Sequence, residues 1–333
     1  MAHGILERDF VKANSLETDW HKKTLALNRV LTREDFPDVV LRDLQFDNGS
    51  EFKPLVTGGN VWRIPVSDDD GLPCGEPIGE SFSLFTPRQG FDWIHEMLSG
   101  TGFSVERVGM LWNRSRWFIS IHLDEIATLA RPGEKFQLNV STGLDGSLAR
   151  QAELSNIRVV CHNTNSLSRV MGQVLFRAKN TKNANSRMNS DEIRKEFDKA
   201  AGMARVWNEA MAGLENTACH EQTAREIYAG AVIPKDAEKV STAARNTVDG
   251  LTGLFRSGLG NNGRTMADVL HGFTQFGTRG FETSKKDTWT RIESSEFGGM
   301  ADKKADFTRA MFSENAREGM RENGAKLLSL PVN

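Results

Sequence analysis

The chain has 333 residues, of which 38% are hydrophobic and 26% charged, and its formal net charge is −2. This composition is typical of a globular protein with a core, and it excludes a disordered or membrane-embedded chain. No apolar run approaches the roughly eighteen residues that a membrane span needs, and acids interrupt the start where a signal peptide is apolar. We therefore expect a cytoplasmic protein. Because the charge is nearly balanced, any surface for nucleic acid has to be local.

The first region, residues 1–80, is predicted to consist of loops with one or two edge strands. Residues 35–70 are rich in Asp and are interrupted by several prolines and glycines. A dense run of turn residues from Asp68 to Pro77 ends this region.

The second region, residues 81–190, is predicted to be an α+β core. Alternating apolar residues and turn signals predict a strand, a helix that begins with Pro87, a hairpin and a further strand, in that order. The ranges are 81–86, 88–98, 103–112 with 116–123, and 135–143. Residues 147–171 have a mainly helical pattern, although the β-rich residues 158–161 could interrupt it. The expected fold class is therefore α+β, with a small antiparallel sheet followed by a helix.

The rest of the chain is predicted to be helical up to residue 284 and then to form a polar tail. Ser190 can cap a long amphipathic helix over residues 191–214. Shorter helices are expected over 221–229, 236–256 and 265–276. These patterns divide the chain into four consecutive regions, 1–80, 81–190, 191–284 and 285–333.

No motif for catalysis or metal binding is visible. The chain has no HExxH or GxSxG sequence, and its seven histidines lack ligand spacing. Cys74, Cys161 and Cys219 are far apart without CxxC spacing, which argues against a disulfide framework and a zinc knuckle. We expect them to be core residues. The prediction is a protein that is not an enzyme and that uses no metal or cofactor.

The most informative segment is residues 156–190, which contain no Asp or Glu; we call it the acid-free strip. Its six cationic side chains and seven asparagines can bond to phosphates and base edges, so the strip predicts a polyanion ligand. The candidate contacts are Arg158, Asn163, Arg169, Arg177, Lys179, Lys182 and Arg187. The alternative is a solvated face whose asparagines serve turns and caps.

Residues 258–265, GLGNNGRT, have the spacing of a phosphate-binding loop, except that Arg264 stands where lysine belongs. The loop follows an apparent helix rather than a buried strand, so we expect a turn between two helices. The N-terminus of the second helix, together with Arg264, is a further candidate phosphate contact.

Three aromatic residues lie on or beside the predicted hairpin: Trp112, Trp117 and Phe118. Stacking of bases on such rings is what sequence-tolerant single-strand binders use. One face of any sheet has to be buried, however, so we expect most of these rings to be core residues.

Four stretches resemble the family of phage- and plasmid-like proteins known as domain of unknown function 932. They are SFSLFTPRQGFDWIHEML from Ser81, RVVCHNTNSLS from Arg158, FRAKNTKNANSRM from Phe176 and GLGNNGRTMADVLHGFTQF from Gly258. The resemblance runs from about residue 15 to 312 and implies a mobile-element context. The predicted order of three strands and a helix before a basic segment is also similar to single-strand annealing proteins of phage recombination.

Three functions remain open at this point. The leading hypothesis is a single-stranded DNA-binding protein of a phage or plasmid. It would act as a homo-oligomer, with strand annealing as its role. The second is a structural or counter-defence protein that binds a host protein. The third is an enzyme that acts on nucleotides through residues 258–265.

Overall fold

The computed structural model describes residues 10–13, 25–27, 29–47, 52–57, 60–99, 102–111, 114–158, 163–172, 175–182, 184, 190–280 and 299–332. For residues 10, 46, 47, 52, 158, 163–165, 190–198 and 279 it describes the backbone alone. The chain forms two compact units that alternate along the sequence. Unit 1 comprises residues 1–129, 136–154 and 174–202, and unit 2 comprises residues 130–135, 155–173 and 203–333.

Among the residues that the structure describes, the main sheet has eight strands, so it is larger than the small sheet predicted. The strands are β1 (Phe10–Lys12), β2 (Leu25–Ala26), β9 (Phe103–Leu111), β10 (Arg116–Leu123), β11 (Glu134–Gly143), β12 (Arg150–Arg158), β13 (Asn163–Ser166) and β14 (Phe176–Ala178). Their order is β13-β12-β11-β10-β9-β1-β2, and β14 also pairs with β12. β9 and β10 form the predicted antiparallel hairpin. The predicted α+β class, with helices in the C-terminal half, is confirmed.

The prediction of a mainly helical segment over residues 147–171 is wrong. Most of it forms β12 and β13, and only α3 (Leu167–Met171) is helical. In β12 the polar Gln151 and Glu153 alternate with Ala152 and Leu154, which are fully buried. This period of two is the pattern of a strand. Because β12 and β13 come between β11 and α3, the predicted order of three strands followed directly by a helix is not found.

The sheet is buried on both faces around β11. Phe136, Leu138 and Val140 are buried on one face, as their alternation predicted. Two polar residues that alternate with them are also buried, since Gln137 is 2% exposed and Ser141 3% exposed. Buried polar groups need hydrogen bonds, and Gln137 accordingly donates to Glu106.

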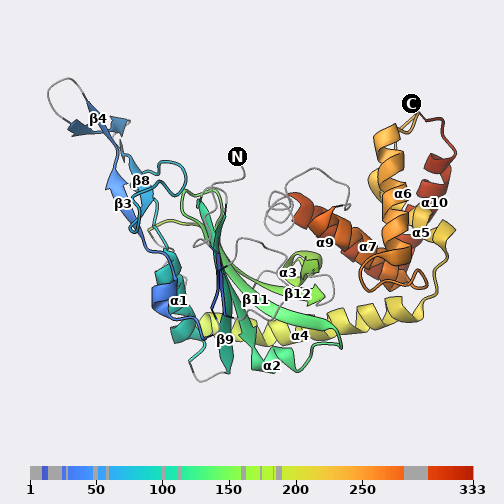
Figure 1. Ribbon diagram of the computed structural model, residues 1–333, viewed down its shortest axis with the longest axis horizontal. Coiled ribbons are helices and arrows are strands. Elements are labelled where there is room, and N and C mark those ends of the chain that lie inside the picture. The colour runs from blue at the N-terminus through green and yellow to red at the C-terminus, as the bar shows by residue number, and fades with distance from the viewer. Residues whose placement is uncertain are drawn as a thin grey trace. The chain divides into compact units, whose positions relative to one another are not determined.

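Helix α1 (Pro87–Met97) covers the apolar face of the sheet in unit 1 (Figure 1). It begins at a capping box in which Thr86 and Gln89 bond each other's backbone N–H groups. Gly90 lies against the indole of Trp117, where a Cβ would come within 2.3 Å of the ring. The indole N–H of Trp117 donates to the carbonyl of Phe85, so this tryptophan is a core residue, as predicted.

The predicted strand over residues 81–86 is not formed. Its ladder pairing in the described chain consists of a single bridge between Phe82 and Thr181. It ends at Thr86, which caps α1. A short helix, α2 (Asp124–Ala127), follows β10 in the same unit.

The N-terminal region forms an arm (Val39–Ser67) built from β3 (Val39–Asp43) and β8 (Arg63–Ser67) (Figure 1). Shorter pairs extend it: β4 (Gln45–Asp47) with β5 (Phe52–Pro54), and β6 (Val56–Thr57) with β7 (Asn60–Val61). Before the arm lies a short 3-10 helix, η2 (Arg33–Asp35).

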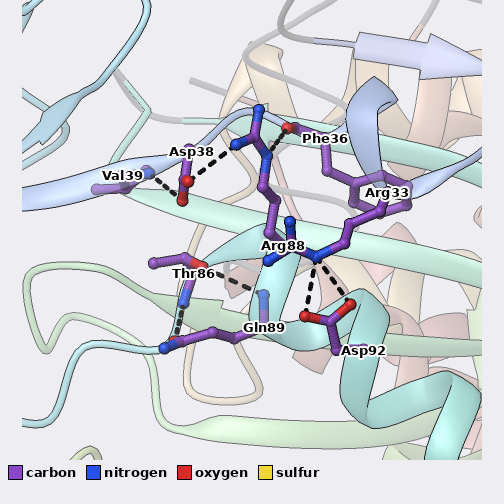
Figure 2. A network of polar contacts seen from close by, with 8 residues as sticks. All are labelled: Arg33, Phe36, Asp38, Val39, Thr86, Arg88, Gln89 and Asp92. Atoms are coloured by element: carbon purple, nitrogen blue, oxygen red, sulfur yellow. Dashed lines mark hydrogen bonds and ion pairs between the residues drawn. The ribbon is translucent and has the colours of Figure 1, made fainter.

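Polar contacts connect residues 33–38, which precede the arm, to α1 (Figure 2). The Nε atom of Arg88 donates to the carbonyl of Phe36 at 3.0 Å, and its Nη1 lies 2.9 Å from Asp38. Arg33 forms an ion pair with Asp92 on the next turn of α1. A cavity of about 220 Å³ lies beside Arg88, with Phe36 and Met110 among its walls.

The helices of the second half are α4 (Ser190–Asn216), α5 (Glu221–Val232), α6 (Thr242–Ser257), α7 (Met266–Arg279), α9 (Gly299–Phe312) and α10 (Glu314–Leu328). The helix predicted from residue 236 therefore begins at Thr242. The region predicted as a polar tail, residues 285–333, contains α9 and α10. Inside the described ranges no helix is long and apolar enough to cross a membrane.

Helices α5 and α10 pack closely in unit 2 (Figure 1). The contact depends on glycine, because a Cβ on Gly324 would lie 1.8 Å from the carbonyl oxygen of Glu226. A second close approach places Gly230 against the backbone of Met320. The hydroxyl of Tyr228 donates to the carbonyl of Val269 on α7. These contacts join three helices that are separate in the sequence.

Candidate nucleic-acid interface

The strongest candidate surface is the β14 segment, which we define as residues 176–182 of unit 1. It pairs antiparallel with the start of β12, so that Arg177 lies opposite Gln151. Its side chains alternate: Ala178 and Asn180 are buried, whereas Arg177 and Lys179 are exposed. Lys182, two residues beyond Asn180, is also exposed. The alternation along the segment therefore places the side chains of Arg177 and Lys179 on its solvent-facing side.

Asn180 fixes this segment from the inside. Its amide nitrogen donates to the carbonyls of Gly143 and Leu148, at 3.0 and 2.9 Å. Its side-chain oxygen accepts from Nε of Arg150. On the other side of the segment, the backbone N–H of Ser83 donates to the carbonyl of Asn180. The backbone that carries the exposed cations is therefore hydrogen-bonded both through the side chain of Asn180 and through its main-chain carbonyl.

Arg150 is a buried cation directly behind the β14 segment. Its guanidinium lies 4.5 Å from the ring centroid of Phe85 and donates to the backbone and hydroxyl oxygens of Ser83. Burial lowers the pKa of Arg150 to about 10, so it remains cationic at neutral pH. Sequence reasoning missed Arg150, because nothing in the sequence separates it from the solvent-facing arginines.

The three exposed cations of the β14 segment differ from the other candidates. Within the described part of the chain, Arg177, Lys179 and Lys182 have no ion pair. Arg169, by contrast, lies 2.7 Å from Asp302 in unit 2. The carbonyl of Arg169 also accepts from Arg309, which bonds the end of α3 to α9. We assign Arg169 a structural contact.

The remaining candidates of the acid-free strip are less well defined. Arg158 and Asn163 are opposite each other in the ladder of β12 and β13, but their side chains are outside the described part of the structure. Arg187 lies outside the described residues, as do Trp112, Cys161 and His162. The strip is also divided, since residues 155–173 belong to unit 2 and residues 174–202 to unit 1.

The loop over residues 258–265 is a turn between α6 and α7, as predicted, and several of its backbone N–H groups already have acceptors. The carboxylate of Asp268 accepts from the N–H groups of Arg264 and Thr265, at 3.0 and 3.1 Å. Thr265 is the N-cap of α7 and forms a capping box with Asp268. An internal carboxylate thus occupies the place that a phosphate would need at this helix N-terminus. The side chain of Arg264 is exposed, as are those of Leu259 and Asn262.

Three further predictions can be compared with the structure. Phe118 is buried, so it is a core residue and not a stacking platform. Cys74 and Cys219 are also buried, and burial together with the charge of Asp268 raises the pKa of the Cys219 thiol to about 12. Among the described residues, no group of three or more His, Cys, Asp or Glu side chains could hold a metal ion.

The comparisons with known proteins identify a family and nothing finer. No curated protein and no solved structure matches the chain. A family model described as Domain of unknown function (DUF932) matches residues 76–303. The match includes α1, the hairpin of β9 and β10, the β14 segment and the loop before α7. The chain therefore belongs to the family with a domain of unknown function, DUF932.

Proposed function

We propose that this protein binds single-stranded DNA through the phosphates of its backbone, at the β14 segment. The observation that carries the proposal is the set of three exposed cations, Arg177, Lys179 and Lys182, without ion-pair partners in the described part of the chain. They project from a backbone that Asn180 bonds in place. Their geometry therefore does not have to be created when a ligand binds.

The spacing of the cations suits an extended polyanion. Arg177 and Lys179 are two residues apart on one side of an extended segment, which places their Cα atoms about 7 Å apart. Successive phosphates of an extended single strand have a spacing of this order. The buried charge of Arg150 adds to the positive potential behind them.

An alternative explanation is that these charges only protect an edge strand. Lys and Arg on edge strands prevent pairing with another chain, and among the described residues β14 pairs with β12 alone. Charge reversal separates the two explanations. Glu at positions 177 and 179 protects the edge equally well, but it repels a phosphate backbone.

Annealing of complementary strands, by an oligomer encoded on a mobile element, is the role that we propose for this binding. Neutralised phosphates allow two strands to approach each other, and no catalytic residue is required. Because β12 and β13 interrupt the predicted order of three strands and a helix, the likeness to annealing proteins no longer supports this role. The proposal rests on the charges of the β14 segment.

The test is a fluorescence-anisotropy titration of labelled single-stranded DNA at several salt concentrations. Three phosphate contacts predict a slope of log affinity against log salt of about −2 per bound chain. The double variant Arg177→Glu/Lys179→Glu should lose at least tenfold in affinity for every sequence. The control is Lys235→Glu/Lys239→Glu, which makes the same charge change at two exposed lysines of unit 2 and should bind normally.

Two outcomes would contradict the proposal. The first is wild-type protein that binds no single-stranded DNA at low salt. The second is equal loss of affinity in both double variants, which would indicate a general charge effect. Either result would shift the search to the second hypothesis, a protein partner, through recovery of a stoichiometric complex from nuclease-treated lysate.

A further inference from the structure

An aromatic pair lies beside the β14 segment, and the sequence did not single it out. The rings of Trp93 on α1 and Phe176 on β14 have centroids 6.0 Å apart, with planes tilted by 41°. Both residues are half-buried. Behind Trp93 lies the buried Phe85, whose ring meets the indole edge-on at 6.4 Å. The pair is therefore supported from the core and keeps part of its surface in solvent.

The pair and the cations border the same edge of the sheet. Side chains alternate along a strand, so Phe176 projects from one face of β14 and Arg177 from the other. β12 pairs with Phe176–Ala178 on one side of the strand. On the other side the described chain forms no ladder along these three residues, whereas the continuation of the segment at Asn180 and Thr181 is paired with residues 82 and 83. The long stems of Arg177 and Lys179 can bring their charged heads to this edge. A nucleotide at the edge can thus contact a cation through its phosphate and a ring through its base.

We infer, on the basis of the proposed function, that Trp93 and Phe176 form a base-stacking site that makes the β14 segment selective for single strands. Base–aromatic stacking is tolerant of sequence because every base has a π-face. A base in a duplex presents its faces to its neighbours in the stack, so it is not available to these rings. The cations supply affinity for any nucleic acid, and the aromatic pair supplies the preference for unpaired bases.

The competing explanation is that the two rings only close the edge of the hydrophobic core. Trp117 illustrates that role: it is 1% exposed, and its indole N–H is bonded to Phe85. Trp93 and Phe176 differ from it because both residues are half-buried, and Phe176 precedes the exposed Arg177 in β14. A variant that keeps apolar bulk but removes the π-face distinguishes packing from stacking.

The experiment compares single-stranded oligo(dT) with a blunt DNA duplex of equal length at one salt concentration. In the variant Phe176→Leu, and in Trp93→Leu/Phe176→Leu, the affinity for oligo(dT) should fall by about tenfold or more. The affinity for the duplex should stay within twofold of wild type. The variant Arg177→Glu/Lys179→Glu should lose affinity for both ligands. A matched control is Trp62→Leu, at a half-buried tryptophan of the arm, which should change neither affinity.

A second readout is tryptophan fluorescence. Oligo(dT) should quench the emission of the wild type, and Trp93→Phe should lose that quenching while it retains binding. The inference is overturned if the leucine variants lose both affinities equally, or lose neither, while the wild type still binds. Absence of any binding by the wild type is a different result, because it removes the proposed function itself. Single Phe176→Leu on the edge strand keeps the test interpretable if the double variant misfolds.

Discussion

The side-chain oxygen of Asn180 lies 3.0 Å from Nε of Arg150, so one amide bonds a buried cation while it also anchors the β14 segment. The same amide donates to two carbonyls of the turn after β11. A residue of the acid-free strip thus connects the interior of unit 1 to the surface cations on either side of it. The DNA binding that we propose for the β14 segment would therefore depend on this interior contact as well as on its charges.

Asn180→Ala should destabilise the protein and weaken DNA binding together. The change removes the amide from the carbonyl of Gly143 and from the Nε of Arg150, and each such loss costs about 1–3 kcal/mol, whereas the carbonyl of Leu148 keeps the N–H of Gly143. We expect a decrease of about 3 kcal/mol or more in the free energy of unfolding, measured by urea titration. Asn60→Ala, at an exposed position of the arm, should have little effect. Equal stability of the two variants would show that the network is not important for the fold.

Gly324→Ala should destabilise unit 2, because its Cβ would overlap the carbonyl oxygen of Glu226. Forcing the helices apart costs about 1–3 kcal/mol. The control is Gly319→Ala on the same helix, where a Cβ would meet nothing within 4 Å. There the change should stabilise the helix by about 0.5–1 kcal/mol. Thermal unfolding should therefore shift in opposite directions for the two variants.

Asp268→Ala should destabilise the turn before α7. The carboxylate bonds the N–H groups of Arg264 and Thr265, and loss of such a cap costs about 1–2 kcal/mol. Asp268→Asn keeps one oxygen acceptor and should recover part of that loss in a urea titration. If Asp268→Asn instead gained affinity for inorganic phosphate without a change in stability, the carboxylate would be a placeholder for a ligand.

Glu134→Gln should raise the unfolding midpoint at neutral pH. Burial raises the pKa of Glu134 above its usual 4.5, although the N–H groups of Trp207 and Asn156 oppose this shift. The folded state holds the proton of Glu134 more strongly than the unfolded state, so protonation of Glu134 stabilises the fold. This stabilisation is fully present below pH 4.5 and is lost as the pH rises through the folded pKa. Glutamine keeps an oxygen acceptor without the charge.

The measurement for Glu134 is thermal unfolding between pH 4 and pH 8. The variant should be more stable than wild type at the upper end of this range, and the difference should shrink toward the lower end. Glu125→Gln, at an exposed position, should follow the wild-type curve. A variant that is less stable than wild type at every pH would show that the charged carboxylate stabilises the fold.

Several elements could be predicted from the sequence because their signals are local. Pro87 and the cap at Thr86 mark the start of α1, and the alternation in β9 and β10 marks the hairpin. The spacing of Trp207 and Met211 predicted α4 in the same way. Residues 150–158 were misjudged because Gln151, Glu153 and the residues around them carry no strong β propensity. Pairing with β13 and β14 makes this segment a strand.

The sequence by itself determined that residues 156–190 lack acids, and therefore that a positive surface had to be sought there. Only the tertiary structure decided which of the charges remain available. Arg169 forms an ion pair with Asp302, which is far away in the sequence, whereas Arg177 and Lys179 are exposed on the β14 segment. The physical reason is that a charge is neutralised by its neighbours in space. The composition of a segment gives the charges within that segment, but it does not show which acids from distant parts of the sequence the fold places next to them.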